Sequence, residues 1–241
     1  MNGFASSRGA LLLVAAAAAL LGASATLLIS HFGSGSQIRD YLLAHPEVIP
    51  EAIQRLRDRD NAKVIAANRA DILTPVGDAW AGNPSGDVTV VEYLDYNCAY
   101  CRASLATIDQ LIAADKGVKV IYRELPVLSP ESDTAARYAI VAGRSGKYNA
   151  LHRALYAGGP LTEASMDKAL VDAGLDPAKV KAEAKSASVD AAIKTNLSMM
   201  RPLGLTGTPS WVIGDRVVSS VLSLEDMRAA VEAARAAKPP T

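Results

Sequence analysis

The sequence has little cysteine and little histidine, and this scarcity narrows the kinds of site that it could carry. Its 241 residues include only two cysteines and three histidines. A structural zinc site normally needs four cysteine or histidine ligands, and the histidines are scattered without ligand spacing, so we expect no metal site. Cys98 and Cys101 are so close that a purely structural disulfide between them would constrain the unfolded chain very little. An excess of one charge is also missing, because 25 basic residues balance 25 acidic ones, and we expect no nucleic-acid partner.

Charge is absent from a long stretch near the N-terminus. Arg8 is the only charged side chain before Arg39, and residues 10–29 are uncharged. A run of this kind behind a basic residue is typical of export, with the positive end kept in the cytoplasm. Small residues predict signal-peptide cleavage after Ala25, whereas the apolar residues that follow lengthen the run toward a membrane span. We therefore expect residues 1–30 to be either a cleaved signal peptide or an inner-membrane anchor of a periplasmic protein.

Both cysteines stand where a predicted strand meets a predicted helix. Residues 88–94 are apolar and rich in β-branched side chains, which indicates a strand. After Cys101 the apolar residues recur at helical spacing, at Leu105, Ile108, Leu111 and Ile112. Free N–H groups and the positive end of the dipole favour a thiolate at the start of a helix. A Cys-x-x-Cys in this setting is typical of a thioredoxin-like redox site, and an oxidising compartment suits it.

The rest of the chain predicts an α/β domain that contains an all-helical insertion. A strand at 118–124 should lie parallel to the strand before the cysteines, through a βαβ crossover. Residues of about 130–205 read as helices throughout, and β signals return in a hairpin at 210–219. A final helix is expected at 224–237, capped by a serine. We therefore expect a catalytic domain over residues 88–237, divided by the helical insertion.

Ahead of this domain the sequence predicts a separate helical segment. A Gly/Ser stretch at 32–36 reads as a linker, and the short helix after it should break at Pro46 before a longer helix that reaches about residue 73. The apolar stripe of this amphipathic segment needs a partner, either its own domain or another copy of the chain. We expect homo-oligomerisation through residues 37–73. A second linker, rich in Gly and Pro, covers residues 74–87.

Three motifs give the chain a resemblance to a known family. They are Asp95-Tyr96-Asn97-Cys98-Ala99-Tyr100-Cys101, Arg123-Glu124-Leu125-Pro126-Val127-Leu128 and Leu203-Gly204-Leu205-Thr206-Gly207-Thr208-Pro209-Ser210. Over about residues 88–237 the chain resembles the DsbA-like branch of the thioredoxin superfamily, and its exported ScsC-type subgroup in particular. Residues 38–49 also resemble the N-terminal extension of ScsC-like proteins, which oligomerises in some members. The resemblance implies a thioredoxin-like α/β fold with an inserted all-helical subdomain, preceded by an N-terminal helical extension. It also implies an exported thiol-disulfide oxidoreductase, either an oxidase or an isomerase.

The order of the cysteines predicts their roles. Cys98 should be the exposed attacking thiol, and Cys101, one turn deeper, should resolve the mixed disulfide. Glu92 is a charged residue in an apolar strand, and alternation places it on the same face as Val90 and Leu94. It lies six residues before Cys98, as does the buried acid of the DsbA-like pattern, which implies that it accepts the proton of Cys101. The alternative is that Glu92 reaches solvent at the end of the strand.

Two further pairs of residues take their expected roles from the resemblance. It implies a cis peptide bond before Pro209, facing the dithiol, and a backbone at Thr208 that pairs with an extended substrate. An ordinary trans proline at the start of a strand is the alternative. Between the cysteines, Ala99 and Tyr100 replace the pattern of the strongly oxidising DsbA proteins, which carry a histidine there. Tyr100 is typical of isomerase-like and ScsC-like members.

The expected partners follow from this chemistry. We expect substrate proteins that carry thiols or disulfides and a membrane redox partner, and we expect no cofactor. A function of another class is Cu(I) binding in copper tolerance, because the thiolates of Cys98 and Cys101 suit a soft metal ion. No histidine cluster supports that function, and Met199-Met200 is a single pair that suits a helix core better.

Overall fold

The N-terminal part of the chain is helical. The structure, a computed structural model, describes residues 4–237 and divides into two compact units, Met1–Leu56 and Arg57–Thr241. Residues 1–3 of the expected leader lie outside the described residues. Helix α1 (Phe4–Ala44) ends just before Pro46, and α2 (Val48–Ala67) follows, so the predicted break is confirmed. Among residues 4–237, no helix combines the length and the apolar character that crossing a membrane requires.

Two expectations for this region are wrong in detail. No linker interrupts the helix at residues 32–36, because α1 continues through them. Each glycine costs a helix only about 1 kcal/mol and each serine less, and the alanines and leucines nearby favour helix strongly. The predicted long helix is in turn divided into α2 and α3 (Arg69–Leu73). Asn68 separates them with a non-helical backbone (φ −114°, ψ 26°), and its side-chain amide donates to the carbonyl oxygen of Val64 at 2.8 Å.

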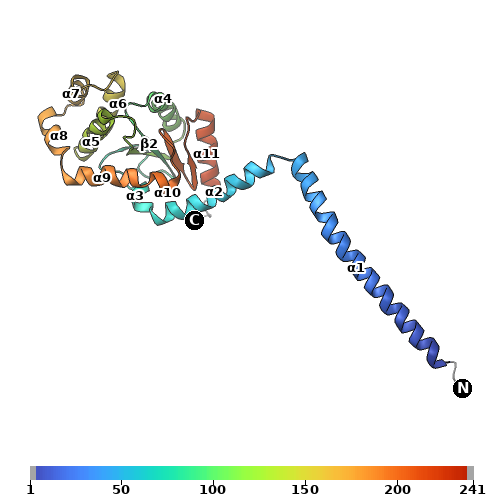
Figure 1. Cartoon of the computed structure of the whole chain (residues 1–241). Coiled ribbons are helices and arrows are strands. Elements are labelled where there is room, and N and C mark those ends of the chain that lie inside the picture. Colours follow the sequence, from blue (N-terminus) through green and yellow to red (C-terminus); the bar gives the residue numbers. More distant parts are fainter. Residues whose placement is uncertain (1–3, 238–241) are drawn as a thin grey trace. The chain divides into compact units, whose positions relative to one another are not determined.

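A mixed sheet of five strands forms the centre of the second unit (Figure 1). The strand order is β1-β3-β2-β4-β5. Strands β2 and β3 are parallel, as the predicted βαβ crossover requires, and β4 and β5 form the predicted antiparallel hairpin. Strand β1 forms an antiparallel edge beside β3. The bounds are β1 Trp80–Gly82, β2 Val88–Leu94, β3 Val118–Glu124, β4 Ser210–Ile213 and β5 Arg216–Val218.

Two hydrophobic cores lie on opposite faces of this sheet. Alternate residues of each strand enter different cores, as the period of two in a strand requires. On one face, residues such as Val90 and Leu94 pack with α4 (Ala99–Ala114), with α11 (Leu224–Ala237) and with the insertion. On the other face, residues such as Val91 and Tyr93 pack with the end of α2, with α3 and with α10 (Met200–Leu203). The active-site residues described below belong to the first face.

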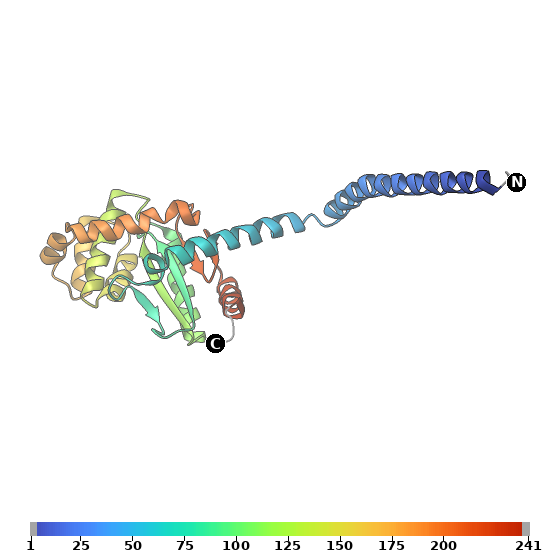
Figure 2. The same cartoon turned by 90° about the horizontal axis from the view of Figure 1, so that it is seen from below.

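The insertion is helical, as predicted, and its helices gather at one side of the sheet (Figure 1; Figure 2). Local capping explains where several of them begin. The side chains of Ser129, Thr162 and Asp176 each accept backbone N–H groups at a helix start, which is the usual role of these residue types. The last part of the insertion is divided into α9 and α10. The other bounds are α5 Pro130–Arg144, α6 Tyr148–Ala157, α7 Glu163–Asp172, α8 Pro177–Glu183 and α9 Ala187–Ser198.

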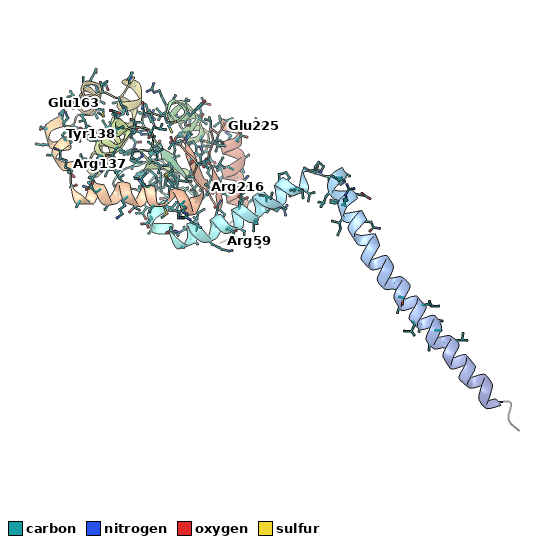
Figure 3. The ribbon with its side chains drawn as sticks, in the orientation of Figure 1. Arg59, Arg137, Tyr138, Glu163, Arg216 and Glu225 are labelled. Carbon is teal, nitrogen blue, oxygen red and sulfur yellow. The ribbon has the colours of Figure 1, made fainter. Side chains whose placement is uncertain are left out.

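Ion pairs join the insertion's helices at its surface. Arg137 on α5 binds Asp133 one turn earlier and Asp190 on α9. Lys181 on α8 reaches Glu163 at 3.0 Å. Arg137, Tyr138 and Glu163 lie together on the insertion, whereas Glu225 on α11 lies on the opposite side of the domain (Figure 3). Partly exposed pairs of this kind each contribute little to stability, so the apolar core holds the insertion together.

The predicted N-terminal segment is shared between the two units. Ile65 on α2 and Ile72 on α3 are buried against the sheet, in one cluster with Val91 and Ile121. The guanidinium of Arg123 on β3 donates to the carbonyl oxygens of Ile72 and Thr74. For residues 57–73, the alternative that the stripe packs on its own domain is therefore the one observed.

Candidate active site

Cys98 begins the helix that follows the central strand. It is the N-cap residue of α4, and its sulfur accepts the backbone N–H of Cys101 at 3.4 Å. The thiol of Cys98 donates to the carbonyl oxygen of Thr208 at 3.2 Å. Both cysteines are free thiols. The sequence thus predicted the position of Cys98 correctly, at the junction between a buried strand and a helix.

Cys101 lies behind Cys98 in the core. Its exposed fraction is 1%, compared with 6% for Cys98. The expectation that Cys98 is exposed is therefore wrong, because the helix start and the Thr208 carbonyl cover its sulfur, although Cys98 is the less buried of the two. Burial raises the pKa of the Cys101 thiol strongly, and the negative charge of Glu92 raises it further. A thiol must lose its proton before it can attack a disulfide. Cys101 therefore needs a nearby proton acceptor if it is to react.

Thr208 and Pro209, in the loop that leads into β4, lie beside the dithiol. Gly204, with a φ of 64°, ends α10 and begins the turn that leads to them. The peptide bond between Thr208 and Pro209 is cis, and strand β4 starts directly afterwards. The cis bond and its place facing the cysteines agree with what the resemblance implied. The carbonyl of Thr208 thereby lies beside the sulfur of Cys98.

Glu92 lies in the core below the cysteines. Only 2% of it is exposed, so the alternative that it reaches solvent is wrong. It is on the face of Val90 and Leu94, and its Oε1 atom has no hydrogen-bond partner among the described residues. Burial raises its pKa well above the usual range, and the nearby charge of Glu124 raises it further. The charge of Glu92 raises the pKa of Cys101, and the charge of Cys98 raises the pKa of Glu92.

Asp95 fixes the loop before Cys98 to two neighbouring segments. One carboxylate oxygen accepts the N–H of Asn97 at 2.7 Å and the hydroxyl of Ser132 at 2.6 Å. The other accepts the N–H groups of Val127 and Leu128, at 2.9 and 3.0 Å. Asp95 is almost completely buried, and these four donors replace the water that it loses. The start of α4, the loop after β3 and the start of α5 are held together by this one side chain.

A second buried acid, Glu124, lies on the same face of the sheet, and the sequence analysis assigned it no role. Its Oε1 atom accepts the hydroxyls of Tyr148 at 2.6 Å and Tyr96 at 3.2 Å. The Tyr96 hydroxyl also contacts Nδ1 of His152 at 3.0 Å. The sequence did contain a signal for it. Glu124 is an acid at a position that alternation in β3 assigns to the same face as Val120 and Tyr122, just as Glu92 is an acid on the apolar face of β2.

The groups in this cluster have shifted pKa values. Burial raises the pKa of Glu124 to about 8, although the tyrosine hydroxyls oppose this rise. Burial also lowers the pKa of His152 to about 3. At neutral pH the folded protein therefore holds His152 neutral and Glu124 largely protonated.

The free energy of unfolding should fall as the pH rises from about 6.5 to 8. A carboxyl whose pKa is higher in the folded state binds more protons there than in the unfolded chain, so raising the pH destabilises the fold. Over this interval Glu124 contributes a loss of about 2 kcal/mol, and Glu92 acts in the same direction. His152 acts in the opposite sense, but only below its unfolded value near 6.5. Urea unfolding of the reduced protein measures the slope, and Glu124→Gln should remove the part that Glu124 contributes. A slope unchanged in that variant would contradict the assignment.

Comparisons with known proteins agree with this geometry. Residues 74–233 match the family described as "Thioredoxin". The chain belongs to the thioredoxin family. Residues 35–63 match a second family, described as "Copper resistance protein ScsC N-terminal domain". The DsbA-like and ScsC-type resemblance inferred from the motifs is confirmed, as is the fold class with its helical N-terminal region.

Solved structures of this thioredoxin type are similar over most of their length. A thioredoxin-like oxidoreductase from Silicibacter pomeroyi DSS-3 is 38% identical with a TM-score of 0.68, and the match covers 71% of this chain and 99% of that one. The thiol-disulfide exchange protein α-DsbA2 from Wolbachia pipientis is 28% identical with a TM-score of 0.67, over 74% and 97% of the two chains. A curated relative, the Na⁺/H⁺ antiporter NhaA 1 of Salinispora arenicola, is 32% identical over 92 residues. That match covers 36% of this chain but only 14% of the antiporter's length.

Proposed function

We propose that the protein is an exported thiol-disulfide oxidoreductase that exchanges disulfides with substrate proteins through Cys98 and Cys101. The main support is the position of Cys98, which begins α4 beside the Thr208 carbonyl, with Cys101 buried behind it. The start of a helix favours a thiolate. The uncharged stretch at residues 10–29 supports export. Membership of the thioredoxin family supports the reaction class.

The geometry supports a two-step reaction. In the first step, the Cys98 thiolate attacks a substrate disulfide, and one substrate sulfur leaves with the bonding electrons. In the second step, Glu92 accepts the proton of Cys101, whose sulfur attacks Cys98 and releases the other substrate sulfur. The protein becomes a disulfide and the substrate a dithiol, and oxidation of a substrate is the same sequence in reverse. The backbone at Thr208 is placed to pair with an extended substrate chain beside Cys98.

An apolar rim near Cys98 suits unfolded polypeptides as substrates. Tyr100 is 65% exposed, Leu128 52% and Val127 39%. Asp95 holds the backbone of Val127 and Leu128 next to the loop that carries Cys98. Exposed apolar groups around a reactive centre commonly mark a binding surface.

The direct test is refolding of a scrambled multi-disulfide protein, with the solution mass measured on the same sample. A catalyst should accelerate the recovery of native disulfides, and the same protein should reduce a model peptide disulfide in a single turnover. If reduced protein leaves both substrates unchanged over hours, the proposed function is wrong. Whether oxidation or reshuffling is faster distinguishes an oxidase from an isomerase.

Glu92→Gln should slow the second step without unfolding the protein. Glutamine keeps the shape of the side chain but cannot accept the proton of Cys101, and loss of a general base typically costs 10²–10⁴-fold. The first step should keep its rate, so mixed disulfide should accumulate when samples are acid-quenched between about pH 6 and 9, where thiols titrate. Equal rates of release in the two proteins would exclude Glu92 as the acceptor. Glu225→Gln, an exposed acid on α11 (Figure 3), is the matched control.

The apolar face of the N-terminal unit supports self-association. Ile49, Ile53 and Leu56 are each nearly half exposed and lie at helical spacing on one face of α2. Ile38 and Tyr41 are exposed on α1. We propose that a second copy of this chain covers these residues, because an isologous contact lets one apolar face satisfy another. Several dithiols around one cleft would raise the effective concentration that an isomerase needs.

Ile49→Lys combined with Ile53→Lys should convert the oligomer into a monomer. Two charges in the centre of an apolar contact would have to be desolvated without partners. Sedimentation of the protein after removal of residues 1–25 measures the change. Glu51→Lys alters the net charge equally on the other side of the same helix and should leave the oligomer intact. A monomeric parent protein would refute the self-association.

The description of the second matched family favours one alternative, Cu(I) binding by the same dithiol. Two thiolates such as those of Cys98 and Cys101 are suitable ligands for Cu(I). Within residues 4–237 no group of three or more His, Cys, Asp or Glu side chains is arranged to hold a metal ion. Met199 is buried in the core on the opposite face of the sheet, with Val91 and Tyr93. Cu(I) titration against a competing chelator, beside the single-turnover assay, separates the two functions.

A further inference from the structure

The proposed mechanism uses one buried acid and leaves a second unexplained. Glu92 pairs with Tyr122 across β2 and β3, and Leu94 pairs with Glu124. The two acids are therefore diagonal neighbours on one face, with Cα atoms about 8 Å apart from the spacing of adjacent strands and the rise of two residues. Each has one carboxyl oxygen without a hydrogen-bond partner, Oε1 of Glu92 and Oε2 of Glu124. Like charges at this separation in a buried site cannot both form easily.

The surroundings of the two acids differ in a way that decides which is charged first. Glu124 receives hydrogen bonds from Tyr148 and Tyr96, and such donors stabilise a carboxylate. By contrast, Oε1 of Glu92 has no hydrogen-bond partner among the described residues. The first negative charge of the pair therefore settles on Glu124.

The other titratable groups around the pair do not supply a compensating positive charge. His152 is kept neutral by burial, and Arg123 on the neighbouring position of β3 is on the opposite face, bonded to the backbone of residues 72 and 74. Asp95 and Tyr96 before α4 and Tyr148 on α6 act on Glu124, whereas Glu124 and Cys98 act on Glu92. Glu92 in turn acts on Cys101, Tyr122 and Tyr156, and His152 contacts the Tyr96 hydroxyl.

We propose that Glu124 limits the resolving step by competing with Glu92 for the single negative charge that this pocket accepts. The inference rests on the proposed function. When Glu124 is ionised, Glu92 keeps its proton and cannot take the one on Cys101, so the mixed disulfide persists. When Glu124 is neutral, Glu92 can ionise and the step proceeds. Glu124 thus acts through Glu92, whose ionisation it controls, and does not touch the substrate.

The proton of Cys101 moves to Glu92, the Cys101 sulfur bonds to the Cys98 sulfur, and the bond between Cys98 and the substrate sulfur breaks. The substrate sulfur leaves with the electron pair as a thiolate. The protein dithiol is oxidised and the substrate disulfide is reduced, with no other reactant.

The test is the rate of mixed-disulfide decay as a function of pH. Reduced full-length protein is mixed with a fluorogenic peptide disulfide, and acid quenching measures the mixed disulfide on Cys98 from pH 6 to 10. In the parent protein the decay rate should rise with pH and level off near 8, where Glu124 ionises. In Glu124→Gln it should keep rising, so that at pH 9 the variant is roughly tenfold faster than the parent, one factor of ten per pH unit. Glu225→Gln should follow the parent.

An increase in rate is a result that mere damage to the core would not produce. Tyr148→Phe provides a second measurement, which tests the proposal even if Glu124→Gln fails to fold. Losing one donor raises the pKa of Glu124, so the plateau should begin at higher pH. A parent that forms no mixed disulfide would refute the proposed function. A reactive parent whose plateau is unchanged in both folded variants, or whose variants are slower at every pH, would overturn the inference about Glu124 alone.

Discussion

Cys98→Ser is expected to reduce thiol-disulfide exchange by roughly 10³-fold or more, the order of loss seen when a covalent nucleophile is removed. The serine hydroxyl is not ionised at neutral pH and cannot form the mixed disulfide. Cys101 cannot substitute for it, because Cys101 is almost fully covered and its thiol holds its proton strongly. Single-turnover reduction of the fluorogenic peptide measures the loss.

Cys101→Ser should give the opposite kinetic signature. The first attack depends on Cys98 alone, so its rate should stay near that of the parent, while the mixed disulfide should persist until an external thiol releases it. Non-reducing electrophoresis and mass measurement identify the trapped species. If Cys101→Ser turns over normally, or if Cys98→Ser forms the trapped species, the roles of the two cysteines are reversed.

The stability of the unit that carries the dithiol should depend strongly on how much of the N-terminal segment is removed. Removing residues 37–56 should leave a folded monomer, because the compact unit that carries the dithiol begins at Arg57. Removing residues 37–73 should unfold most of the protein. It takes away Ile65 and Ile72, both buried against β2 and β3. At about 2–5 kcal/mol for each buried isoleucine, the loss is comparable with a total stability of about 5–15 kcal/mol.

Urea unfolding followed by circular dichroism compares the two truncations directly. The shorter truncation should retain peptide reduction but recover scrambled disulfides slowly, because it lacks the self-association surface. Equal stability of the two truncated proteins would show that the α2–α3 contacts contribute little. A parent rate of disulfide reshuffling in the shorter truncation would separate isomerisation from self-association.

Much of the fold could be read from local patterns. The periods of two and 3.6 in the apolar residues predicted β2, β3, the hairpin and α11 to within about a residue, and they predicted that a helix follows the cysteines. The errors fall where tertiary contacts decide. Nothing near Ile72 in the sequence indicates that it packs under β2 and not against another chain. The continuation of α1 through residues 32–36 was missed because composition suggests a linker, while the cost of glycine in a helix is modest.

The candidate site was predicted unevenly for similar reasons. Cys98 and Cys101 carry a strong local motif, and alternation in β2 places Glu92 on the face of Val90 and Leu94, but it does not decide whether the side chain is buried. The cluster around Glu124 joins side chains from β3, the loop before α4 and α6, which are far apart in the sequence. Only the folded chain shows that Tyr148 and His152, which look like ordinary helix residues, surround a second acid.

The insertion is fastened at both of its ends beside the carboxyl ends of β2 and β3. Ser132, at its beginning, binds Asp95, and Asn196, near its end, binds the backbone carbonyl of Glu124. With both ends fixed in this way, the chain between them behaves as a closed loop, and doubling the length of such a loop costs only about 0.6 kcal/mol in closure entropy. The turns farthest from the sheet, such as that at Gly174, can therefore lengthen or shorten during evolution while the dithiol keeps its geometry.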